Sequence, residues 1–281
     1  MTEEIHVLGA SGRSGAALCR ALLAAGHPVV PVIRNAAKFD ALAIPATPAI
    51  ADLTDPPALA AALARATCVV SCAHARHAAA ILAAAPRARF IFLGSTRRYT
   101  KWPDDHANGV RAGEAAFRAA GRPGVMLHPT MIYGAQGEDN VQRLAALLRR
   151  LPVVPLPGGG RALVQPIHQP DLTACILASI ATRWDGPETL VVAGPTPLPY
   201  ADFVRAVAAA AALPPPRIVP LPALLLRAIA PITALPGLPR IRRAEIRRLL
   251  EDKAFDIAPM RARLGVTPTP LAEGLAQLFH P

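Results

Sequence analysis

Short apolar runs alternate with longer amphipathic segments through the first half of the chain. The runs are rich in Val, Ile and Leu, and Gly, Pro, Asn or Asp residues flank most of them, which is typical of buried strands. We expect strands over 5–8, 28–33, 46–51, 68–72, 89–93 and 125–128. The intervening segments predict helices over 13–25, 57–66, 77–85 and 104–120. Strands this apolar, separated by helices, predict an α/β fold with a doubly wound parallel sheet.

The second half of the chain has a different pattern. We expect helices over 141–150, 171–181 and 201–213, a strand over 189–192, a Pro/Gly loop over 152–160, and Pro-rich joints at 214–216 and 220–222. The change of pattern predicts a main domain over 1–135, with later strands returning to it from 161–193. Residues 136–281 then form a small, mostly helical lobe with C-terminal helices.

Residues 218–235 are the most apolar stretch of the chain. Arg227 and the prolines at 220, 222 and 231 interrupt it, which argues against a membrane-spanning helix. We expect a buried lobe helix over about 223–229, and the alternative is a surface that faces a membrane or a partner. The arginines at 240–243 and 247–248 predict a solvated helix face.

Three glycines, Gly9, Gly12 and Gly15, follow the first apolar run and lead into the first amphipathic segment. Strand, glycine turn and helix form the context in which such glycines bind a dinucleotide. Gly9 permits a tight turn, Gly12 lets the backbone approach a pyrophosphate, and Gly15 lets the helix pack closely on the strand. The helix N-terminus then faces the phosphates. The alternative is a glycine turn that binds nothing.

Composition and charge narrow the classes of function. The chain has 281 residues, 52% of them hydrophobic, which is enough for one large α/β domain or a domain with a smaller lobe. Its formal net charge of +11 favours anionic partners such as phosphorylated cofactors. Aromatic residues make up only 4%, and no zinc-finger pattern is present, so we expect no nucleic-acid partner.

The four cysteines form no C-x-x-C pair and lie at no metal-ligand spacing with a histidine. We therefore expect reduced, buried cysteines in a cytoplasmic protein without a metal site. No basic segment followed by an apolar run precedes the first strand, so we expect no signal peptide.

Further motifs give the chain a resemblance to the short-chain dehydrogenase/reductase superfamily, in its extended or atypical branch with epimerase-like members. Residues 9–15 (GASGRSG) resemble the loop G-A-S/T-G-x-x-G, and residues 128–134 (HPTMIYG) resemble the turn R-P-x-x-I/V-Y-G. Residues 165–172 resemble a segment of the family's substrate lobe, and residues 255–257 and 264–268 resemble its C-terminal pattern. The resemblance covers nearly the whole chain and implies a Rossmann-like dinucleotide-binding domain over 1–135 with a substrate lobe beyond it.

The resemblance also implies which residues contact the cofactor. They are Gly9, Ser11, Gly12, Arg13, Ser14 and Gly15 in the glycine loop, Asp52 and Leu53 after the third strand, Ser71, Cys72 and Ala73 at the fourth, and Pro129 and Ile132 after the sixth. An NAD site of this type usually ends its second strand with an acidic residue that binds the ribose hydroxyls. This chain has Arg34 there, with Lys38 nearby, so we expect a preference for NADP(H), with NAD(H) as the alternative.

The resemblance breaks at the family's catalytic pair, Tyr-x-x-x-Lys, on the helix after the fifth strand. Aligning the chain on Glu114 puts Val110 at the Lys position and His106 at the Tyr position, and no Tyr-x-x-x-Lys occurs anywhere. The candidate catalytic residues are then Ser95 and Thr96, which end the fifth strand, and His106, because imidazole titrates near neutrality. Strand-end hydroxyls are equally often simple caps, and His106 is otherwise a polar residue at a helix start.

Two tyrosines lie near these candidates. Tyr99 is too close to the fifth strand and has a lysine, Lys101, at the wrong spacing, while Tyr133 is expected to be structural. Two functions follow. The first is an NAD(P)-dependent reductase or epimerase-like oxidoreductase acting on an unidentified small carbonyl or alcohol. The alternative is a non-catalytic NADP(H)-binding regulator or assembly subunit.

Overall fold

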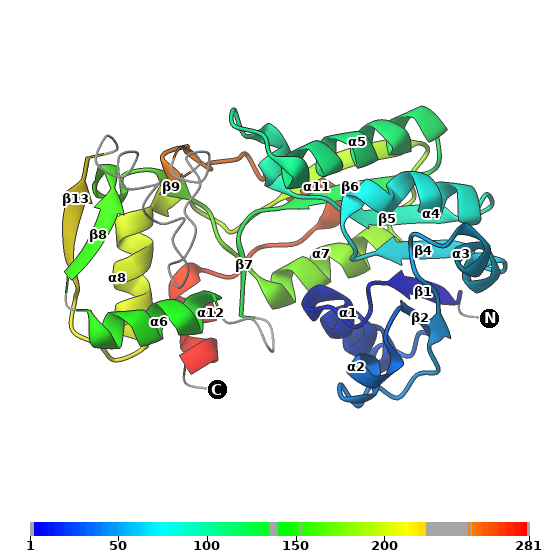
Figure 1. Ribbon diagram of the computed structural model, residues 1–281, viewed down its shortest axis with the longest axis horizontal. Coiled ribbons are helices and arrows are strands. Elements are labelled where there is room, and N and C mark those ends of the chain that lie inside the picture. The colour runs from blue at the N-terminus through cyan, green and yellow to red at the C-terminus, as the bar shows by residue number, and fades with distance from the viewer. Residues whose placement is uncertain (1–2, 135–139, 152, 223–246, 248, 280–281) are drawn as a thin grey trace, which may run out of the picture.

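The computed structural model describes residues 3–134, 140–151, 153–222, 247 and 249–279. At its centre is a seven-stranded parallel sheet in the order β11-β6-β5-β4-β1-β2-β3 (Figure 1). The strands are β1 (Ile5–Leu8), β2 (Val29–Ile33), β3 (Ala49–Ile50), β4 (Cys68–Ser71), β5 (Arg89–Leu93), β6 (Gly124–Pro129) and β11 (Pro187–Val192). The strand order reverses direction between β1 and β4, which places a ligand crevice at the carboxyl ends of these two strands.

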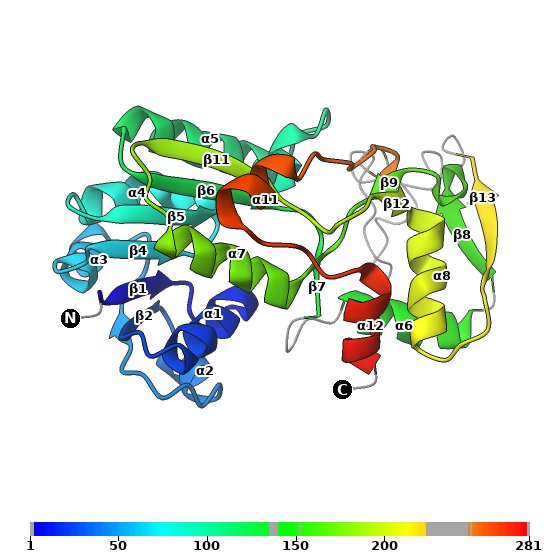
Figure 2. The ribbon, with the colours of Figure 1, turned by 180° about the vertical axis from the view of Figure 1, so that it is seen from behind.

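Helices cover both faces of the sheet (Figures 1 and 2). One face carries α1 (Arg13–Ala24), α7 (Gln169–Ala181) and α11 (Ala258–Leu264), and the other carries α3 (Pro56–Leu63), α4 (Ala78–Ala84) and α5 (Asp105–Ala120). Shorter elements are α2 (Ala36–Asp40), η1 (Ala75–His77) and η2 (Thr96–Tyr99). The apolar side chains of the sheet therefore divide into two cores, one on each face. This is the doubly wound, Rossmann-like α/β fold that the alternating pattern predicts.

Local chemistry explains where several helices begin and end. The Asp55 carboxylate accepts a hydrogen bond from the Ala58 backbone N–H (3.1 Å) and caps α3. Asp104 accepts in the same way from Ala107 (3.0 Å) and caps α5. At the other end of α5, Gly121 takes the left-handed conformation (φ +62°) that glycine adopts without strain.

In the residues that the structure describes, the lobe packs three helices around its own core, α6 (Asn140–Arg150), α8 (Tyr200–Ala210) and α12 (Leu271–Phe279). Its described part also contains three two-stranded sheets. They pair β7 (Ile132–Tyr133) with β10 (Ile167–His168), β9 (Leu163–Val164) with β12 (Leu198–Pro199), and β8 (Val153–Pro157) with β13 (Arg217–Leu221). A 3₁₀ turn, η3 (Gly158–Gly160), follows β8.

These small sheets add strands that the sequence did not predict to a lobe whose described part is still mostly helical. The expected Pro/Gly loop over 152–160 contains β8, and the expected joint at 220–222 overlaps the end of β13. Proline is tolerated in these strands because each has only one neighbour, so half of its N–H groups need no partner strand. Of the strands expected to return from 161–193, only β11 joins the main sheet. The helix expected over about 223–229 lies outside the described residues.

Within the described part of the chain, no helix combines the length and hydropathy needed to cross a bilayer. The four cysteines are free thiols; Cys19, Cys68 and Cys175 are buried and Cys72 is partly buried. Burial raises the pKa of Cys19, Cys68 and Cys175 to about 12, so these thiols are unreactive at neutral pH.

Candidate functional site

The glycine loop between β1 and α1 has the geometry of a phosphate-binding turn. Gly9 has a φ of +72°, and its carbonyl accepts a hydrogen bond from the Gly12 N–H at 2.9 Å. A Cβ added to Gly15 would lie 2.3 Å from the Gly9 carbonyl oxygen, so only glycine allows α1 to start this close to β1. Gly12 is the N-cap of α1, and as a glycine it has no side chain with which to cap the helix. The N–H groups of the first turn therefore remain for an anionic ligand.

A groove of about 1190 Å³ runs along this loop between α1 and α7. Seven of the predicted cofactor residues line it: Ser11, Gly12, Arg13, Ser14, Gly15, Lys38 and Cys72. The loop is also tied to α7, because the Ser14 hydroxyl donates to Gln169 Oε1 at 2.9 Å. The buried Gln169 amide donates in turn to Thr173 Oγ1 at 3.1 Å. Sequence reasoning missed Gln169, although it lies in the motif segment 165–172.

Arg34 and Asp52 lie beyond the groove, at the ends of β2 and β3. The Arg34 guanidinium is 80% exposed, and its Nη1 lies 3.8 Å from Asp52 Oδ2. The backbone and hydroxyl of Thr54 both donate to the Asp52 carboxylate and, with a smaller effect from Arg34, lower its pKa. Asn35 caps α2 by accepting from the Lys38 N–H (2.9 Å), which places Lys38 in the first turn after Arg34. This end of the site presents two exposed cations.

The remaining predicted cofactor residues lie at strand ends of the main sheet or in β7. Ser71 ends β4 and is buried, and its hydroxyl has no hydrogen-bond partner among the described residues. Ala73 follows β4 directly beneath the glycine loop, since a Cβ on Gly9 would lie 3.0 Å from its backbone nitrogen. Leu53 lies after β3 and packs on the core of the second face. Pro129 ends β6, whereas Ile132 belongs to β7 and pairs with Ile167.

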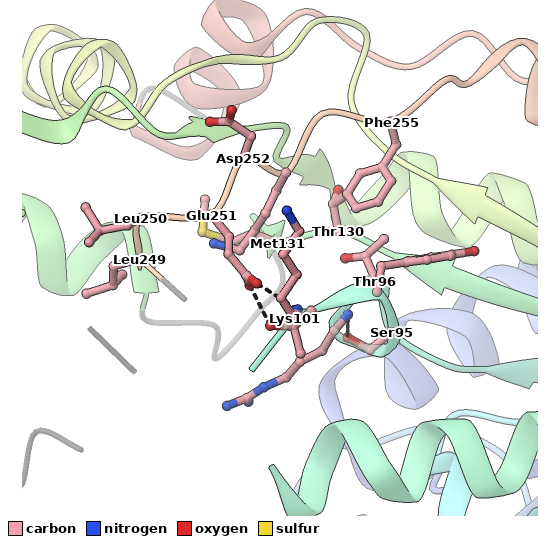
Figure 3. A pocket seen from close by; sticks show the side chains of 14 residues that line it. Ser95, Thr96, Lys101, Thr130, Met131, Leu249, Leu250, Glu251, Asp252 and Phe255 are labelled. Atoms are coloured by element: carbon pink, nitrogen blue, oxygen red, sulfur yellow. Dashed lines mark hydrogen bonds between the residues drawn. The ribbon is translucent and has the colours of Figure 1, made fainter. Parts of the chain in front are cut away.

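A second cavity, of about 780 Å³, opens at the carboxyl ends of β5 and β6 (Figure 3). Ser95 and Thr96, the candidate catalytic residues from the sequence, line it. The Thr96 hydroxyl donates to the Pro129 carbonyl at 3.1 Å, whereas the Ser95 hydroxyl accepts from the Arg97 N–H at 3.1 Å. In the part of the chain that the structure describes, the Ser95 hydroxyl hydrogen has no acceptor, so this group can donate to a ligand oxygen.

His106 lies elsewhere. Its ring packs edge-on against His74, with ring centroids 4.4 Å apart, and it lines neither of the two cavities. Burial lowers the pKa of both histidines, and that of His74 falls to about 4. Val110, at the position of the family's lysine, is 1% exposed and packs in the core. The structure thus brings Ser95 and Thr96 together but leaves His106 apart from them.

A buried ionic cluster supports the loop that carries Ser95. The Ser95 N–H donates to His128 Nδ1 (3.2 Å), and His128 Nε2 lies 3.1 Å from Glu114 Oε2. Glu114 also pairs with Arg98 (2.7 Å) and Arg118 (3.1 Å). Burial by itself would raise the Glu114 pKa, but the contact with His128 and the two guanidinium charges lower it. In the sequence, His128 begins the motif at 128–134 and Glu114 is the residue on which the catalytic helix was aligned. Nothing in the sequence indicates that these two residues contact each other.

Residues 249–255 form the outer wall of the 780 Å³ cavity, and sequence reasoning missed this role. The segment is held in place by the buried Gln165, whose Oε1 accepts from the Phe255 N–H at 2.8 Å. Tyr133 is fully buried and stacks on His168, with centroids 5.1 Å apart, in agreement with the structural role expected from the sequence. No group of three His, Cys, Asp or Glu side chains among the described residues is placed to hold a metal ion.

Comparison with known proteins agrees with the geometry of the glycine loop. Residues 9–121 match the protein family described as NAD(P)H-binding. A search of curated proteins found no match. Over residues 9–121 the chain is similar to NAD(P)H-binding proteins, and the whole chain has the Rossmann-like fold described above.

Solved structures with the same fold include both epimerases and reductases. A nucleoside-diphosphate-sugar epimerase from Pseudomonas aeruginosa is 20% identical, with 99% of this chain and 96% of that chain covered and a TM-score of 0.75. An NADPH-dependent quinone oxidoreductase from Escherichia coli, complexed with NADPH, is also 20% identical, with 98% and 100% covered and a TM-score of 0.75. The triphenylmethane reductase of Citrobacter sp. is 17% identical, with 99% and 100% covered and a TM-score of 0.76.

Proposed function

We propose that this protein is an NADPH-preferring reductase of a carbonyl compound. The observation that carries the proposal is the placement of two sites on one sheet edge. A phosphate-binding glycine loop lies at the end of β1, and a cavity lined by Ser95 and Thr96 lies at the end of β5. In a parallel sheet these ends share one edge, so a dinucleotide bound at the first can reach the second.

The chain's own residues account for cofactor binding. The N–H groups at the start of α1 hold the pyrophosphate, and the missing side chains of Gly9 and Gly12 give it room. Arg34 and Lys38 attract the 2′-phosphate of NADPH at the other end. A guanidinium forms paired, charge-assisted hydrogen bonds with a phosphate. Bound NADPH would supply a hydride for reduction.

Reduction fits the residues at the cavity better than epimerisation does. Epimerisation through alcohol oxidation requires a base that removes the hydroxyl proton, and the family's Tyr-x-x-x-Lys pair is missing from this chain. Reduction requires only that the carbonyl be oriented and its oxygen stabilised while the proton comes from water. The Ser95 hydroxyl can donate to that oxygen, and the Thr96–Pro129 hydrogen bond fixes the loop beside it.

The test is consumption of NADPH by the purified full-length chain with a panel of aldehydes, ketones and quinones, followed by the absorbance of the reduced nicotinamide. We expect turnover with at least one conjugated carbonyl. Tight NADPH binding without turnover on any member of the panel would contradict the reductase and favour the second candidate.

The second candidate is a non-catalytic NADP(H)-binding regulator or assembly subunit. The burial of Val110 at the position of the family's lysine favours it, because a core residue there cannot hold the nicotinamide ribose or tune an acid. Such a protein would bind NADPH through the same loop, and its measurable output would be a cofactor-dependent change in association with another protein.

A further inference from the structure

The walls of the 780 Å³ cavity change in character from one end to the other (Figure 3). The hydroxyl-bearing residues Ser95, Thr96 and Thr130 gather at one end, and Leu249 and Leu250 lie at the opposite end. Met131 lies between them. The cavity therefore has hydroxyl groups where β5 and β6 end and apolar side chains where it reaches Leu249 and Leu250. A ligand that fills the cavity must therefore have a polar group at one end and an apolar group at the other.

Aromatic rings form part of the cavity wall. The Tyr99 and Phe255 rings lie with centroids 5.6 Å apart and planes tilted by 49°. The Arg98 guanidinium lies 4.7 Å from the centre of the Tyr99 ring, and the hydrogen bond to Gln165 fixes the backbone of Phe255. Because the two planes are tilted, a planar ligand can stack on only one of the rings. The Phe255 ring offers a flat apolar face for a planar conjugated ligand, with the Tyr99 ring beside it.

Glu251 anchors the backbone that carries Leu249 and Leu250 to the opposite wall of the cavity. Its carboxylate accepts from the Thr100 hydroxyl (2.5 Å) and from the Lys101 N–H (2.7 Å). Leu249 and Leu250 remain 49% and 39% exposed, so an apolar chain placed along them would remove both from water. Glu251 and Asp252 line the same cavity as the cations Arg97, Lys101 and Lys253, so charges of both signs surround the ligand space.

We propose that the cavity accepts a planar, conjugated, uncharged carbonyl compound that carries an apolar substituent. This inference rests on the proposed reductase function and names its substrate class. The carbonyl lies at the Ser95 end, the conjugated plane lies against Phe255, and the substituent runs past Met131 to Leu249 and Leu250. Bound NADPH would supply a hydride to the carbonyl carbon and so become oxidised, while the carbonyl oxygen takes a proton from water and leaves hydroxide. Conjugation spreads the charge that forms on the oxygen, so the reaction does not depend on a Tyr/Lys pair.

The test measures binding rather than turnover. Naphthoquinone and its derivatives with a butyl and an octyl chain are titrated by calorimetry into the full-length protein in the presence of oxidised cofactor. We expect each lengthening by four carbons to tighten the dissociation constant at least tenfold, because the methylenes that lie along Leu249 and Leu250 leave water on one side. In the double variant Leu249→Ser/Leu250→Ser the gain from chain length disappears while the affinity of the parent ring stays. Phe255→Ala weakens all three compounds about tenfold.

The matched control is Leu147→Ser, which changes an equally exposed leucine on α6 that does not line the cavity. It should leave all three affinities unchanged, and thermal melting checks that each variant folds. Equal dissociation constants across the series, a chain-length gain that survives in the double variant, or displacement of naphthoquinone by UDP-glucose would overturn the inference. If affinity rises with chain length but no compound oxidises NADPH, the reductase function is wrong and the ligand class assigned to the cavity stands. If NADPH is consumed without any chain-length effect, the assignment fails alone.

Discussion

His128 and Glu114 face each other inside the protein, with Nε2 of the histidine 3.1 Å from Oε2 of the carboxylate. Both side chains are almost completely shielded from water. The other ring nitrogen of His128 accepts a hydrogen bond from the Ser95 N–H. The pair therefore links α5 to the loop whose Ser95 lines the candidate substrate cavity. The contact is a structural support for that loop and does not touch the cavity itself.

Removing the Glu114 carboxylate should therefore destabilise the fold. Glu114→Ala leaves Arg98 and His128 without their anionic partner in a buried setting, and we expect a loss of about 3 kcal/mol in the free energy of unfolding, measured with urea. The control is Glu188→Gln, which breaks the half-exposed pair with Arg263 and should cost less than about 1 kcal/mol. Equal losses in the two variants would show that burial of the Glu114 cluster adds no stability.

The same cluster predicts a pH dependence on the acid side. The Glu114 pKa is lower in the folded state than its ordinary value of 4.5, so the unfolded chain takes up the proton first as the pH falls. Its contribution to stability is complete above pH 4.5 and is lost as the pH falls through the lower folded pKa. Stability curves of wild type and Glu114→Gln should therefore converge below pH 4.5, and parallel curves would contradict this.

His74 should affect the pH dependence of stability over a different pH range. Burial is the main cause that lowers its pKa from 6.5 to about 4, so between these values the unfolded chain binds a proton that the folded chain does not. Stability from this residue is complete above pH 6.5 and falls as the pH drops toward 4. His74→Asn keeps an acceptor for the Arg76 N–H that caps η1 and should flatten this part of the stability curve. An unchanged slope would show that His74 does not contribute.

The sequence predicted the main sheet well because its signals are local. Each strand is a short apolar run, and caps such as Asp55 and Gly121 mark helix ends by chemistry that acts within three residues. The short helix α2 was missed although its cap, Asn35, is visible in the sequence. The strands β8 and β13 were misread because their prolines are compatible with a strand only where the partner strand lies on one side, which is a tertiary property.

In the candidate site, too, the features with local sequence signals were predicted and those that depend on tertiary contacts were not. The glycine loop and the pair Ser95 and Thr96 were predicted because parallel strands bring their carboxyl ends to one edge. The approach of Glu251 to Thr100 joins residues that are 151 positions apart, and no local pattern announces it. His106 was placed at the catalytic position by alignment, whereas its packing against His74 depends on how η1 meets α5.

The glycine loop gives a direct test of cofactor binding. A Cβ on Gly12 would lie 3.1 Å from the Gly9 carbonyl oxygen, and the branches of valine would extend into the space that the pyrophosphate needs. We expect Gly12→Val to abolish NADPH binding measured by fluorescence, with circular dichroism unchanged. Gly186→Ala is the control, because nothing lies within 4 Å of its added Cβ. Retained affinity in a folded Gly12→Val would refute the assigned phosphate position.

Arg34 should set the preference for NADPH. Charge-assisted hydrogen bonds contribute roughly 1.5–3 kcal/mol each, and the 80% exposure of Arg34 reduces this, so we expect about tenfold tighter binding of NADPH than of NADH, or roughly 1.4 kcal/mol. Titration of both reduced cofactors into wild type and Arg34→Ala decides it, with Arg183→Ala as an exposed control on the Asp185 pair. Equal constants in wild type would contradict the preference, and a preference that survives in Arg34→Ala would belong to Lys38 or Arg13.

Catalysis should depend on Ser95 and not on a tyrosine. The Ser95 hydroxyl lines the cavity and can donate to a carbonyl oxygen, so Ser95→Ala should lower kcat at least tenfold, as the loss of an oxyanion donor does. Tyr99 contributes its ring, which packs near Phe255 and His128, and Tyr99→Phe keeps that ring; we expect kcat to change less than about twofold. Thr96→Ser retains the donor to Pro129 and serves as the conservative control. If Tyr99→Phe abolished turnover while NADPH affinity stayed unchanged, the tyrosine hydroxyl would be the proton donor, and the assignment of Ser95 as the oxygen-binding group would be wrong.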